Sequence, residues 1–150
     1  MIKTEKKQKE HYNLISHQYD DIIPKHIADH LKAKRIKLFK ENGLKGKVLD
    51  VGCGTGEILM SLPNKLEKHG VDISEGMIEV AQKKNPNAKF FVWGSTDKMP
   101  FKDGEFDFVY TVAVLHHIIV PENVKKTLKE MYRVTKPGGT IVVWDHNPLN

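Results

Sequence analysis

Apolar residues recur along this chain with two different spacings that follow one another. Short runs rich in β-branched and aromatic residues are typical of buried strands, and apolar residues three or four positions apart are typical of amphipathic helices. The expected strands are 48–51, 66–73, 90–93, 106–110 and 140–145. The run 90–93 is apolar throughout, so we expect it to be buried on both faces of a parallel sheet.

The alternation of strands with helices predicts an α/β fold. We expect a Rossmann-like, doubly wound and mainly parallel sheet with helices on both faces. The expected strand order is 3-2-1-4-5, and a ligand should bind at the carboxyl ends of the strands, at the switch point between the first and the fourth.

The N-terminal part of the chain has the pattern of a separate helical segment. Residues 1 to about 11 are polar and are expected to fray. Tyr12 and Tyr19 have near-helical spacing, and the pattern of a second, longer helix follows. We therefore divide the chain into an N-terminal helical segment, 1–43, and one ligand-binding domain, 44–150.

The stretch that indicates function is Val48–Glu57, VLDVGCGTGE. An apolar strand enters a bend with glycine at every second position, and a helix follows. Glycine permits a positive φ, and its missing Cβ lets backbone amides approach a ligand. Dinucleotide-binding bends have the spacing G-x-G-x-x-G, whereas here G-x-G-x-G precedes Glu57, whose carboxylate would repel a pyrophosphate. The bend therefore favours a ligand that presents an ammonium group or hydroxyls.

A second acidic position stands at the end of the second expected strand. Asp72 lies about 20 residues after the glycines, and Ser74 is a natural N-cap for the helix that follows. One carboxylate at this place can accept hydrogen bonds from both hydroxyls of a ribose. The glycine bend and Asp72 together predict a nucleoside site.

The bend resembles motif I of the class I S-adenosylmethionine (SAM)-dependent methyltransferases, in which this loop surrounds the methionine part of SAM. Gly70–Ser74 and Met131–Thr140 are similar to further stretches of these enzymes, and the resemblance extends over roughly residues 44–146. It implies a methyltransferase of the small-molecule, type 11-like group with SAM as its cofactor. The methyl group would pass by in-line displacement to an unidentified, small-molecule acceptor.

The cofactor contacts that the resemblance implies come from the strand ends and the segments after them. They are Asp50, Gly52, Cys53 and Gly54 in the bend, Asp72, Ile73 and Met77 after the second strand, Ser95 and Thr96 after the third, Thr111, Val112 and Leu115 after the fourth, and Tyr19 in the N-terminal segment. Asp72 is expected to bind the ribose and Ile73 to pack on adenine. The backbone at Thr111 and Val112 is expected to meet the amino group of SAM.

Ser95 marks a departure from the family pattern. Related enzymes usually have G-D-A-x-x-L-P-F where this chain has GSTDKMPF, and their Asp accepts a hydrogen bond from the adenine amino group. A hydroxyl is a weaker acceptor than a carboxylate, and Asp97 lies two positions too late. We therefore expect Ser95 and Thr96 to contact adenine, with somewhat weaker discrimination of that base.

His116 is the candidate catalytic residue. The resemblance places it near the transferred methyl group, and an ordinary histidine pKa suits a general base that takes a proton from the acceptor. The alternative is a ring that packs in the wall with no role in proton transfer. The resemblance also implies that the segment 1–43 is a lid, in which Tyr19 covers the cofactor. The alternative is that Tyr19 is part of a packed aromatic helix face. Cys53 is expected to be a small residue of the bend and not a nucleophile.

Composition argues against several other classes. Residues 1–47 carry 12 Lys and Arg against 6 Asp and Glu, and the rest of the chain carries 12 against 13, so the basic excess is confined to a segment without a nucleic-acid motif. Nucleic acid is therefore not an expected partner. No apolar run approaches the ~18 residues that span a membrane, and the lone Cys53 suits a reducing cytoplasm. His26 and His30 share a helix face, but they lack both the Glu of H-E-x-x-H and a third ligand, so no metal is expected.

The family pattern continues beyond the last expected strand of this chain. Relatives add a helix and two strands, so we expect strands 6 and 7 to be absent, in a truncated chain or a compact variant. Val142, Val143 and Trp144 would then form an exposed apolar edge, which predicts pairing with a second copy as a homodimer. Two other functions stay open at this point, namely a SAM-binding module without catalysis and a nicotinamide-dependent oxidoreductase.

Overall fold

Five apolar segments pair side by side in one sheet, and every pair is parallel. The order is β3-β2-β1-β4-β5, which confirms the predicted fold class and strand order. The strands are β1 Lys47–Val51, β2 Glu67–Asp72, β3 Lys89–Val92, β4 Phe106–Val112 and β5 Thr135–Trp144. This computed structural model describes residues 3–146, so the expected chain boundaries at residues 1 and 150 lie outside the described residues.

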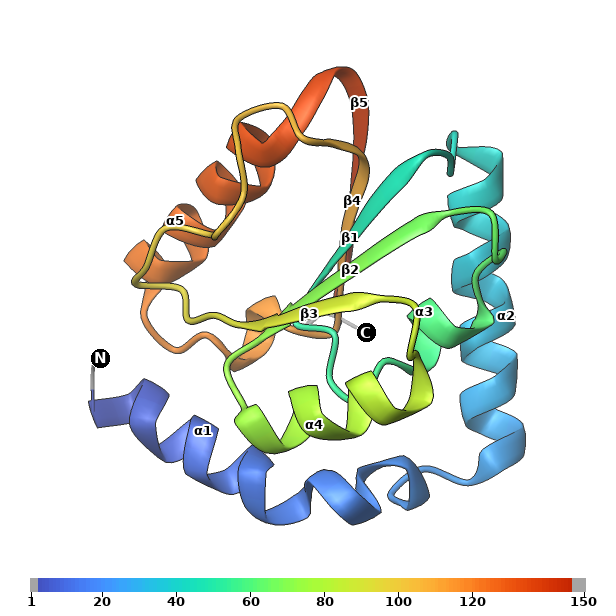
Figure 1. The fold of residues 1–150 in the computed structure, drawn as a ribbon. Helices are drawn as coiled ribbons and strands as arrows, with labels where there is room; N and C mark the ends of the chain where they lie inside the picture. The colour runs from blue at the N-terminus through green and yellow to red at the C-terminus, as the bar shows by residue number, and fades with distance from the viewer. Residues whose placement is uncertain (1–2, 147–150) are drawn as a thin grey trace.

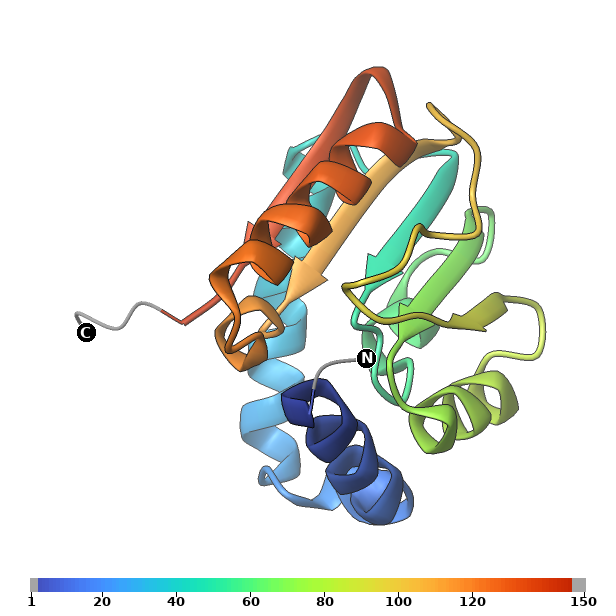
Figure 2. The same cartoon turned by 90° about the vertical axis from the view of Figure 1, so that its left-hand side faces the viewer.

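Helices cover both faces of the sheet and the ends of its strands (Figure 1). The α-helices are α1 Lys3–Ile15, α2 Lys25–Glu41, α3 Glu57–Ser61, α4 Glu75–Lys84 and α5 Pro121–Val134. The chain also forms two short 3-10 helices. In the chain, η1 Ser16–Asp21 lies between α1 and α2, and η2 Leu115–His117 lies between β4 and α5. In Figure 2, α5 lies in front of the sheet, α2 lies behind it, and α1 lies below the arrowheads of β1 and β4.

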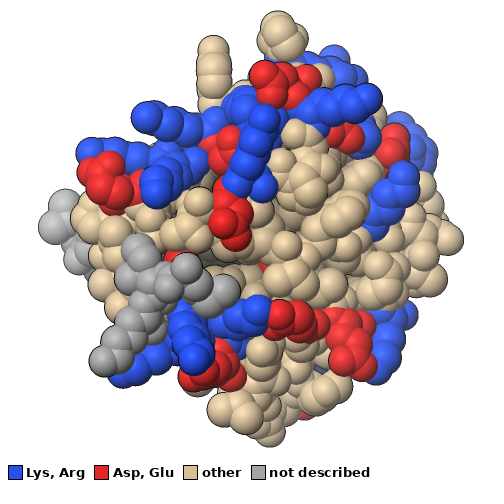
Figure 3. Space-filling model, turned by 60° about the vertical axis from the view of Figure 1, so that its left-hand side comes forward, with Lys and Arg blue, Asp and Glu red and all other residues tan. Residues whose placement is uncertain are grey.

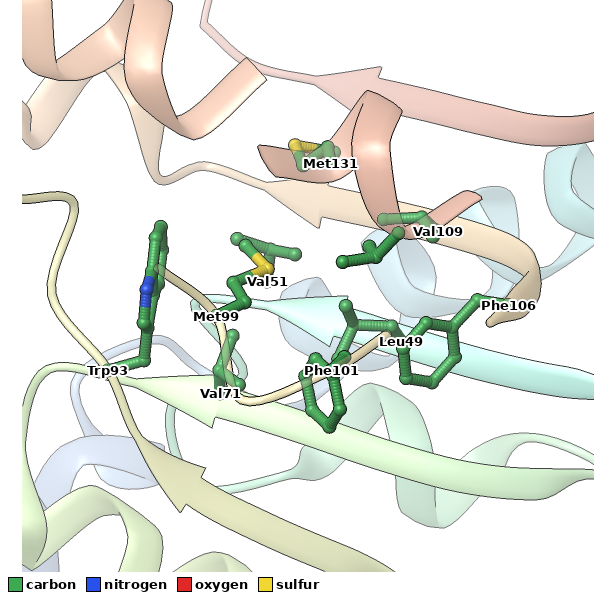
Figure 4. Packing of buried hydrophobic residues seen from close by; sticks show 10 residues of the cluster. Leu49, Val51, Val71, Trp93, Met99, Phe101, Phe106, Val109 and Met131 are labelled. Atoms are coloured by element: carbon green, nitrogen blue, oxygen red, sulfur yellow. The ribbon is translucent and has the colours of Figure 1, made fainter. Parts of the chain in front are cut away.

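Each face of the sheet has its own hydrophobic cluster, because successive strand residues point to opposite faces. The first cluster contains Leu49, Val51, Val71, Trp93, Met99, Phe101, Phe106, Val109, Met131 and Val134 (Figure 4). The second contains Phe39, Val48, Cys53, Leu59, Leu62, Leu66, Phe108 and Tyr110. Phe39 of α2 has no exposed surface, so this helix belongs to the core of the domain.

Two expectations about local structure are wrong. The third strand is not buried on both faces, because it is an edge strand that pairs only with β2, and Phe91 and Val92 are 37% and 46% exposed. The first 11 residues do not fray throughout, because α1 begins at residue 3 and is held by contacts with distant segments. Asn13 of α1 makes two of these contacts, because its Oδ1 accepts hydrogen bonds from Ser74 Oγ at 2.6 Å and from Gly76 N at 3.0 Å.

Candidate functional site

A cavity of about 450 Å³ lies where the strands end. Residues 50–55 after β1, 72–73 after β2, 93–95 after β3 and 112–114 after β4 all line it, and α1, η1 and α2 contribute the rest of its wall. Parallel strands present their carboxyl ends at one edge of the sheet, and the order reverses there between β1 and β4. The cavity therefore occupies the place at which such sheets bind ligands.

The glycine bend forms part of the cavity wall. Gly52, Gly54 and Gly56 have φ values of +79°, +52° and +78°, which favour glycine. A Cβ on Gly52 would lie 2.3 Å from Val114 Cγ2, so packing excludes a side chain there. A Cβ on Gly54 would meet no heavy atom of residues 3–146 within 4 Å. Gly54 lines the cavity, so its bare Cα keeps that space clear for a ligand.

Asp72 links the bend to β2. Its Oδ2 accepts a hydrogen bond from Gly54 N at 2.9 Å, and its Oδ1 accepts one from Ser74 N at 3.0 Å. Burial raises the pKa of Asp72, while the N–H groups that donate to it act in the opposite direction. The carboxylate is thus held in one orientation, and each oxygen keeps a lone pair for another donor.

The amides of the bend are bonded within the protein, which corrects the expectation that they are free for a ligand. Gly52 N and Cys53 N donate to Val71 O at 2.8 and 2.9 Å, and Gly54 N donates to Asp72. The bend therefore contributes its shape and the orientation of a carboxylate rather than these three donors.

Two ionisable residues, Asp50 and Arg35, lie near each other behind the bend. Asp50 is 3% exposed, and burial raises its pKa to about 8, although the Tyr110 hydroxyl and the Arg35 guanidinium lower it. Arg35 of α2 lines the same cavity, and its Nε is buried without a hydrogen-bond partner among the described residues. An arginine stays charged even when burial lowers its pKa, as it does here. The cavity thus contains a cation with an unused donor.

The raised pKa of Asp50 predicts a pH-dependent stability. An unfolded Asp has a pKa near 3.9, so between about pH 4 and about pH 8 the native chain holds a proton that the unfolded chain has lost. The free energy of unfolding should therefore fall as the pH rises through this range, by up to about 1.4 kcal/mol per pH unit from this group. In urea unfolding, the D50N variant should gain stability relative to the wild type between pH 5 and pH 8. Parallel pH profiles for the two proteins would contradict this.

His116 has a carboxylate partner that was not predicted. Its Nδ1 lies 2.5 Å from Asp145 Oδ1, and its backbone N donates to Asp145 Oδ2 at 3.2 Å. Burial raises the pKa of Asp145, but donors from His146 and His116 outweigh this effect and leave it below its ordinary value. His116 lines the cavity, so a charged carboxylate orients its ring at the cavity wall. This is the arrangement in which a histidine can act as a general base.

The N-terminal aromatic residues lie over the cavity. Tyr12 and Tyr19 both line it, with ring centroids 6.2 Å apart. Burial raises the pKa of Tyr12 to about 12 and also raises that of Tyr19, so both phenols stay protonated at neutral pH. They can cover a ligand or donate a hydrogen bond, but they are poor bases.

The backbone after β4 is strained where it meets the cavity. Ala113 has a φ of +56°, which is uncommon for a residue with a side chain. Its N–H donates to Trp144 O at 2.8 Å, and residues 112–114 line the cavity. Strain of this kind persists only where the surrounding structure imposes it, and it is concentrated at functional sites.

Most of the sequence-predicted residues meet at this cavity. Those that line it are Tyr19, Asp50, Gly52, Cys53, Gly54, Asp72, Ile73, Met77, Ser95, Val112 and His116. Thr96, Thr111 and Leu115 are not among the lining residues. Thr111 is fully buried within β4 and points away from the neighbouring Val112, because strand residues alternate between faces.

Several residues that line the cavity were not among those predicted from the sequence. Arg35, Thr55 and Asn123 line the cavity, as does Glu5, which is 5% exposed. Only Thr55 lies within the glycine bend, where its position alone could have suggested a role. The others come from helices whose docking on the cavity cannot be read from periodicity.

Three further observations concern metal ligands, membrane-spanning helices and surface charge. Within residues 3–146, no group of three or more His, Cys, Asp and Glu residues could hold a metal ion. No helix of that range is long and apolar enough to cross a membrane. On the face drawn in Figure 3, acidic side chains lie among the basic ones, and a broad uncharged band lies between two charged zones.

Comparison with known proteins identifies the family. Residues 49–143 match the family described as "Methyltransferase domain". The chain belongs to the class I SAM-dependent methyltransferases. This methyltransferase chain is 37% identical, over 147 residues, to demethylmenaquinone methyltransferase of Staphylococcus saprophyticus, a match that covers 91% of the chain and 62% of that relative. The chain thus spans less than two thirds of the length of this curated relative.

Solved structures agree with the assignment. The PH0226 protein of Pyrococcus horikoshii has a TM-score of 0.74 and 30% identity, covering 86% of the methyltransferase chain and 58% of its own. A SAM-dependent methyltransferase of Aquifex aeolicus has a TM-score of 0.62 and 29% identity, covering 73% and 62%.

Proposed function

We propose that this chain binds SAM in the cavity and catalyses transfer of its methyl group to a small-molecule acceptor. The observation that carries the proposal is Asp72, a buried carboxylate held by Gly54 N and Ser74 N at the edge of a cavity that Gly54 keeps open. A carboxylate fixed in this way suits the two hydroxyls of a ribose. The family assignment supports the same cofactor.

The other groups of SAM find suitable partners in the same cavity. We assign the adenine end to Ile73, Met77 and Ser95, and the amino group to the backbone at 112–114, where Ala113 is strained. Direct contacts of Thr96, Thr111 and Leu115 with the cofactor stay as predictions, and these three residues are not among those that line the cavity. The carboxylate of the methionine part fits Arg35, whose buried Nε has no partner among residues 3–146. A guanidinium pairs well with a carboxylate, since it donates through two parallel N–H groups.

When bound, SAM supplies a methyl group on a positively charged sulfur, which makes that carbon electrophilic. The chain has to align the acceptor behind this carbon and exclude water, and alignment alone can supply a large part of the acceleration. We assign His116 to take the proton that the acceptor loses, with Asp145 holding its ring and stabilising the imidazolium that results. Tyr12 and Tyr19 would close the cavity against water.

For the acceptor, we propose a reduced quinone of the demethylmenaquinone type. The curated relative is named for that acceptor, and Ile23, Ile118, Ile119 and Val120 give the cavity that also contains His116 an apolar wall. In a hydroquinone, loss of a hydroxyl proton makes the neighbouring ring carbon nucleophilic. That carbon would accept the methyl group and then release its own proton, and the hydroxyl would regain one.

Two measurements test this function. Isothermal titration should show that SAM and its demethylated product bind, and that NAD binds more weakly than SAM or not at all. Incubation with SAM and a short-chain demethylmenaquinol should yield the ring-methylated product by mass spectrometry. Tighter binding of NAD than of SAM would overturn the proposal. Binding of SAM without turnover of any quinol would leave a SAM-binding module without this activity.

The contribution of Asp72 can be measured directly. The D72A variant should bind SAM more weakly by about 1.5–3 kcal/mol, roughly 10- to 150-fold in Kd, because a charge-assisted hydrogen-bond acceptor is lost. The matched control is D97A, since Asp97 is an exposed acid outside the cavity lining, and its Kd should match that of the wild type. An unchanged Kd in D72A would remove Asp72 from the site.

We also propose roles for the two ends of the domain. Within the expected lid segment, 1–43, α1 and η1 would act as the lid, because α2 contributes Phe39 to the core. At the other end, β5 is an edge strand with Ile141 and Val143 exposed, and a second copy could pair there. Sedimentation equilibrium would show a dimer if this pairing occurs, and a monomer at high protein concentration would contradict it.

A further inference from the structure

A buried carboxylate from the N-terminal helix forms part of the cavity wall. Glu5 of α1 is 5% exposed and lines the cavity. Its Oε1 accepts hydrogen bonds from Ser95 Oγ and, at 3.3 Å, from Asn123 Nδ2, residues that lie 90 and 118 positions away in the chain. Ser95 and Asn123 also line the cavity. The contacts hold one oxygen of Glu5 in place.

The other carboxylate oxygen of Glu5 is unpaired within the described part of the chain. Glu5 Oε2 is buried and accepts no hydrogen bond from any group of residues 3–146. One residue earlier, the hydroxyl of Thr4 is buried without a partner in the same part of the described chain, and Thr4 also lines the cavity. A buried polar atom without a partner costs free energy, most of all when it is charged. A ligand that offers a donor to Glu5 and an acceptor to Thr4 would remove both costs.

The surroundings of this pair suit a flat ring. Ile73, Trp93 and Gly94 line the cavity next to Ser95. Ile73 Cδ1 would lie 3.7 Å from a Cβ on Gly94, so Ile73 packs close to the backbone that leads into Ser95. A cavity wall with these apolar groups and with an unpaired carboxylate oxygen and hydroxyl, within the described residues, suits an aminated heterocycle, which carries an amino donor beside a ring-nitrogen acceptor.

We propose that Glu5 determines specificity for the adenine ring by accepting a hydrogen bond from its exocyclic amino group. The carboxylate that the chain lacks at position 95 would thus be supplied by α1, with Ser95 and Asn123 orienting it. This inference rests on the proposed binding of SAM. It makes α1 a part of the cofactor site in addition to its role as a cover, because docking of the helix brings the acceptor to the base.

The test compares two ligands that differ along one edge of the purine ring. S-adenosylhomocysteine presents an amino donor beside a ring-nitrogen acceptor, and S-inosylhomocysteine presents a carbonyl acceptor beside a ring N–H donor. Isothermal titration of the wild type should show tighter binding of the adenosyl ligand. In E5Q that ligand should bind at least about 10-fold more weakly, the scale of a hydrogen bond to a charged group. The preference over the inosyl ligand should shrink, because a carboxamide can donate to the carbonyl.

Two further variants sharpen the result. E10Q removes the same charge from an exposed position on α1 and should keep both Kd values. E5Q/S95D returns a carboxylate to the same end of the cavity and should restore the preference for the amino ligand. The ratio of the two Kd values within one variant does not depend on the fraction of folded protein, so partial unfolding of E5Q cannot imitate the effect.

The outcomes separate this inference from the proposed function. If the wild type binds neither SAM nor S-adenosylhomocysteine, the proposed function fails and the role of Glu5 fails with it. If the wild type binds both and E5Q keeps the affinity and the ratio of the wild type, Glu5 has no role in reading the base, while the proposed function stands. The inference is supported if the preference for the adenosyl over the inosyl ligand, measured as the ratio of their Kd values, falls in E5Q and returns in E5Q/S95D.

Discussion

Replacing His116 by glutamine should lower kcat for methyl transfer by about two to four orders of magnitude, the usual contribution of a positioned general base. The ring lies at the cavity wall with Nδ1 2.5 Å from Asp145 Oδ1, so its other nitrogen is left to take the proton of the acceptor. Glutamine cannot accept that proton at neutral pH. Initial rates with saturating SAM and a demethylmenaquinol would measure the loss, and the Kd for SAM should change by less than about threefold.

The neighbouring histidine provides the control. His117 also lines the cavity, but no carboxylate of the described residues forms an ion pair with it. H117Q should therefore retain most of the activity, and D145N should lose less than H116Q, because it removes only the group that orients the ring. A kcat in H116Q within threefold of the wild type would assign His116 to wall packing alone.

The Gly54→Val substitution should weaken SAM binding by about 100-fold, the upper end of the 1–3 kcal/mol that overpacking typically costs. The Cβ position at Gly54 is open space at the cavity wall, so the new side chain would occupy volume that the ligand needs. The φ of +52° adds about 1–2 kcal/mol of backbone strain, because a β-branched residue disfavours that region. Titration calorimetry would measure the affinity, and urea unfolding the stability.

A valine at Gly138 provides a control that separates loss of ligand space from backbone strain. Gly138 has a φ of +77° and, like Gly54, no described heavy atom within 4 Å of a Cβ, but it lies in β5 and does not line the cavity. G138V should therefore lose stability to a similar extent and keep the affinity of the wild type. An equal loss of SAM affinity in both variants would mean that backbone strain weakens binding through the fold. Retained SAM binding in G54V would mean that the glycine bend does not contact the ligand.

Much of the fold followed from local patterns. The glycine bend, the strand order and the N-cap at Ser74, whose Oγ accepts from Met77 N at 3.1 Å, are all as expected. The glycine bend and the N-cap rest on short-range physics, namely the φ that glycine allows and a side chain that bonds to its own helix. The strand order follows from the rules that govern alternating strands and helices. Eleven of the fourteen predicted site residues line the cavity, whereas Thr96, Thr111 and Leu115 do not.

Burial was harder to predict than secondary structure. The apolar run at β3 predicted a buried strand, yet Phe91 and Val92 are partly exposed because that strand is at the edge of the sheet. The polar start of the chain predicted fraying, yet Glu5 and Asn13 anchor α1 through bonds to segments far along the chain. In both cases tertiary position, which composition does not encode, decided the outcome.

The sequence by itself determined a strand, a glycine bend and an acid one strand away, and with them the family, the cofactor class and the edge of the sheet where the cavity lies. Only the tertiary structure decided which side chains complete that cavity: Asp145 beside His116, Arg35 near Asp50, and Glu5 against Ser95. The physical reason is range. Periodicity and turn chemistry act over a few residues, whereas these partners meet through the docking of helices and strand ends that are distant in the chain.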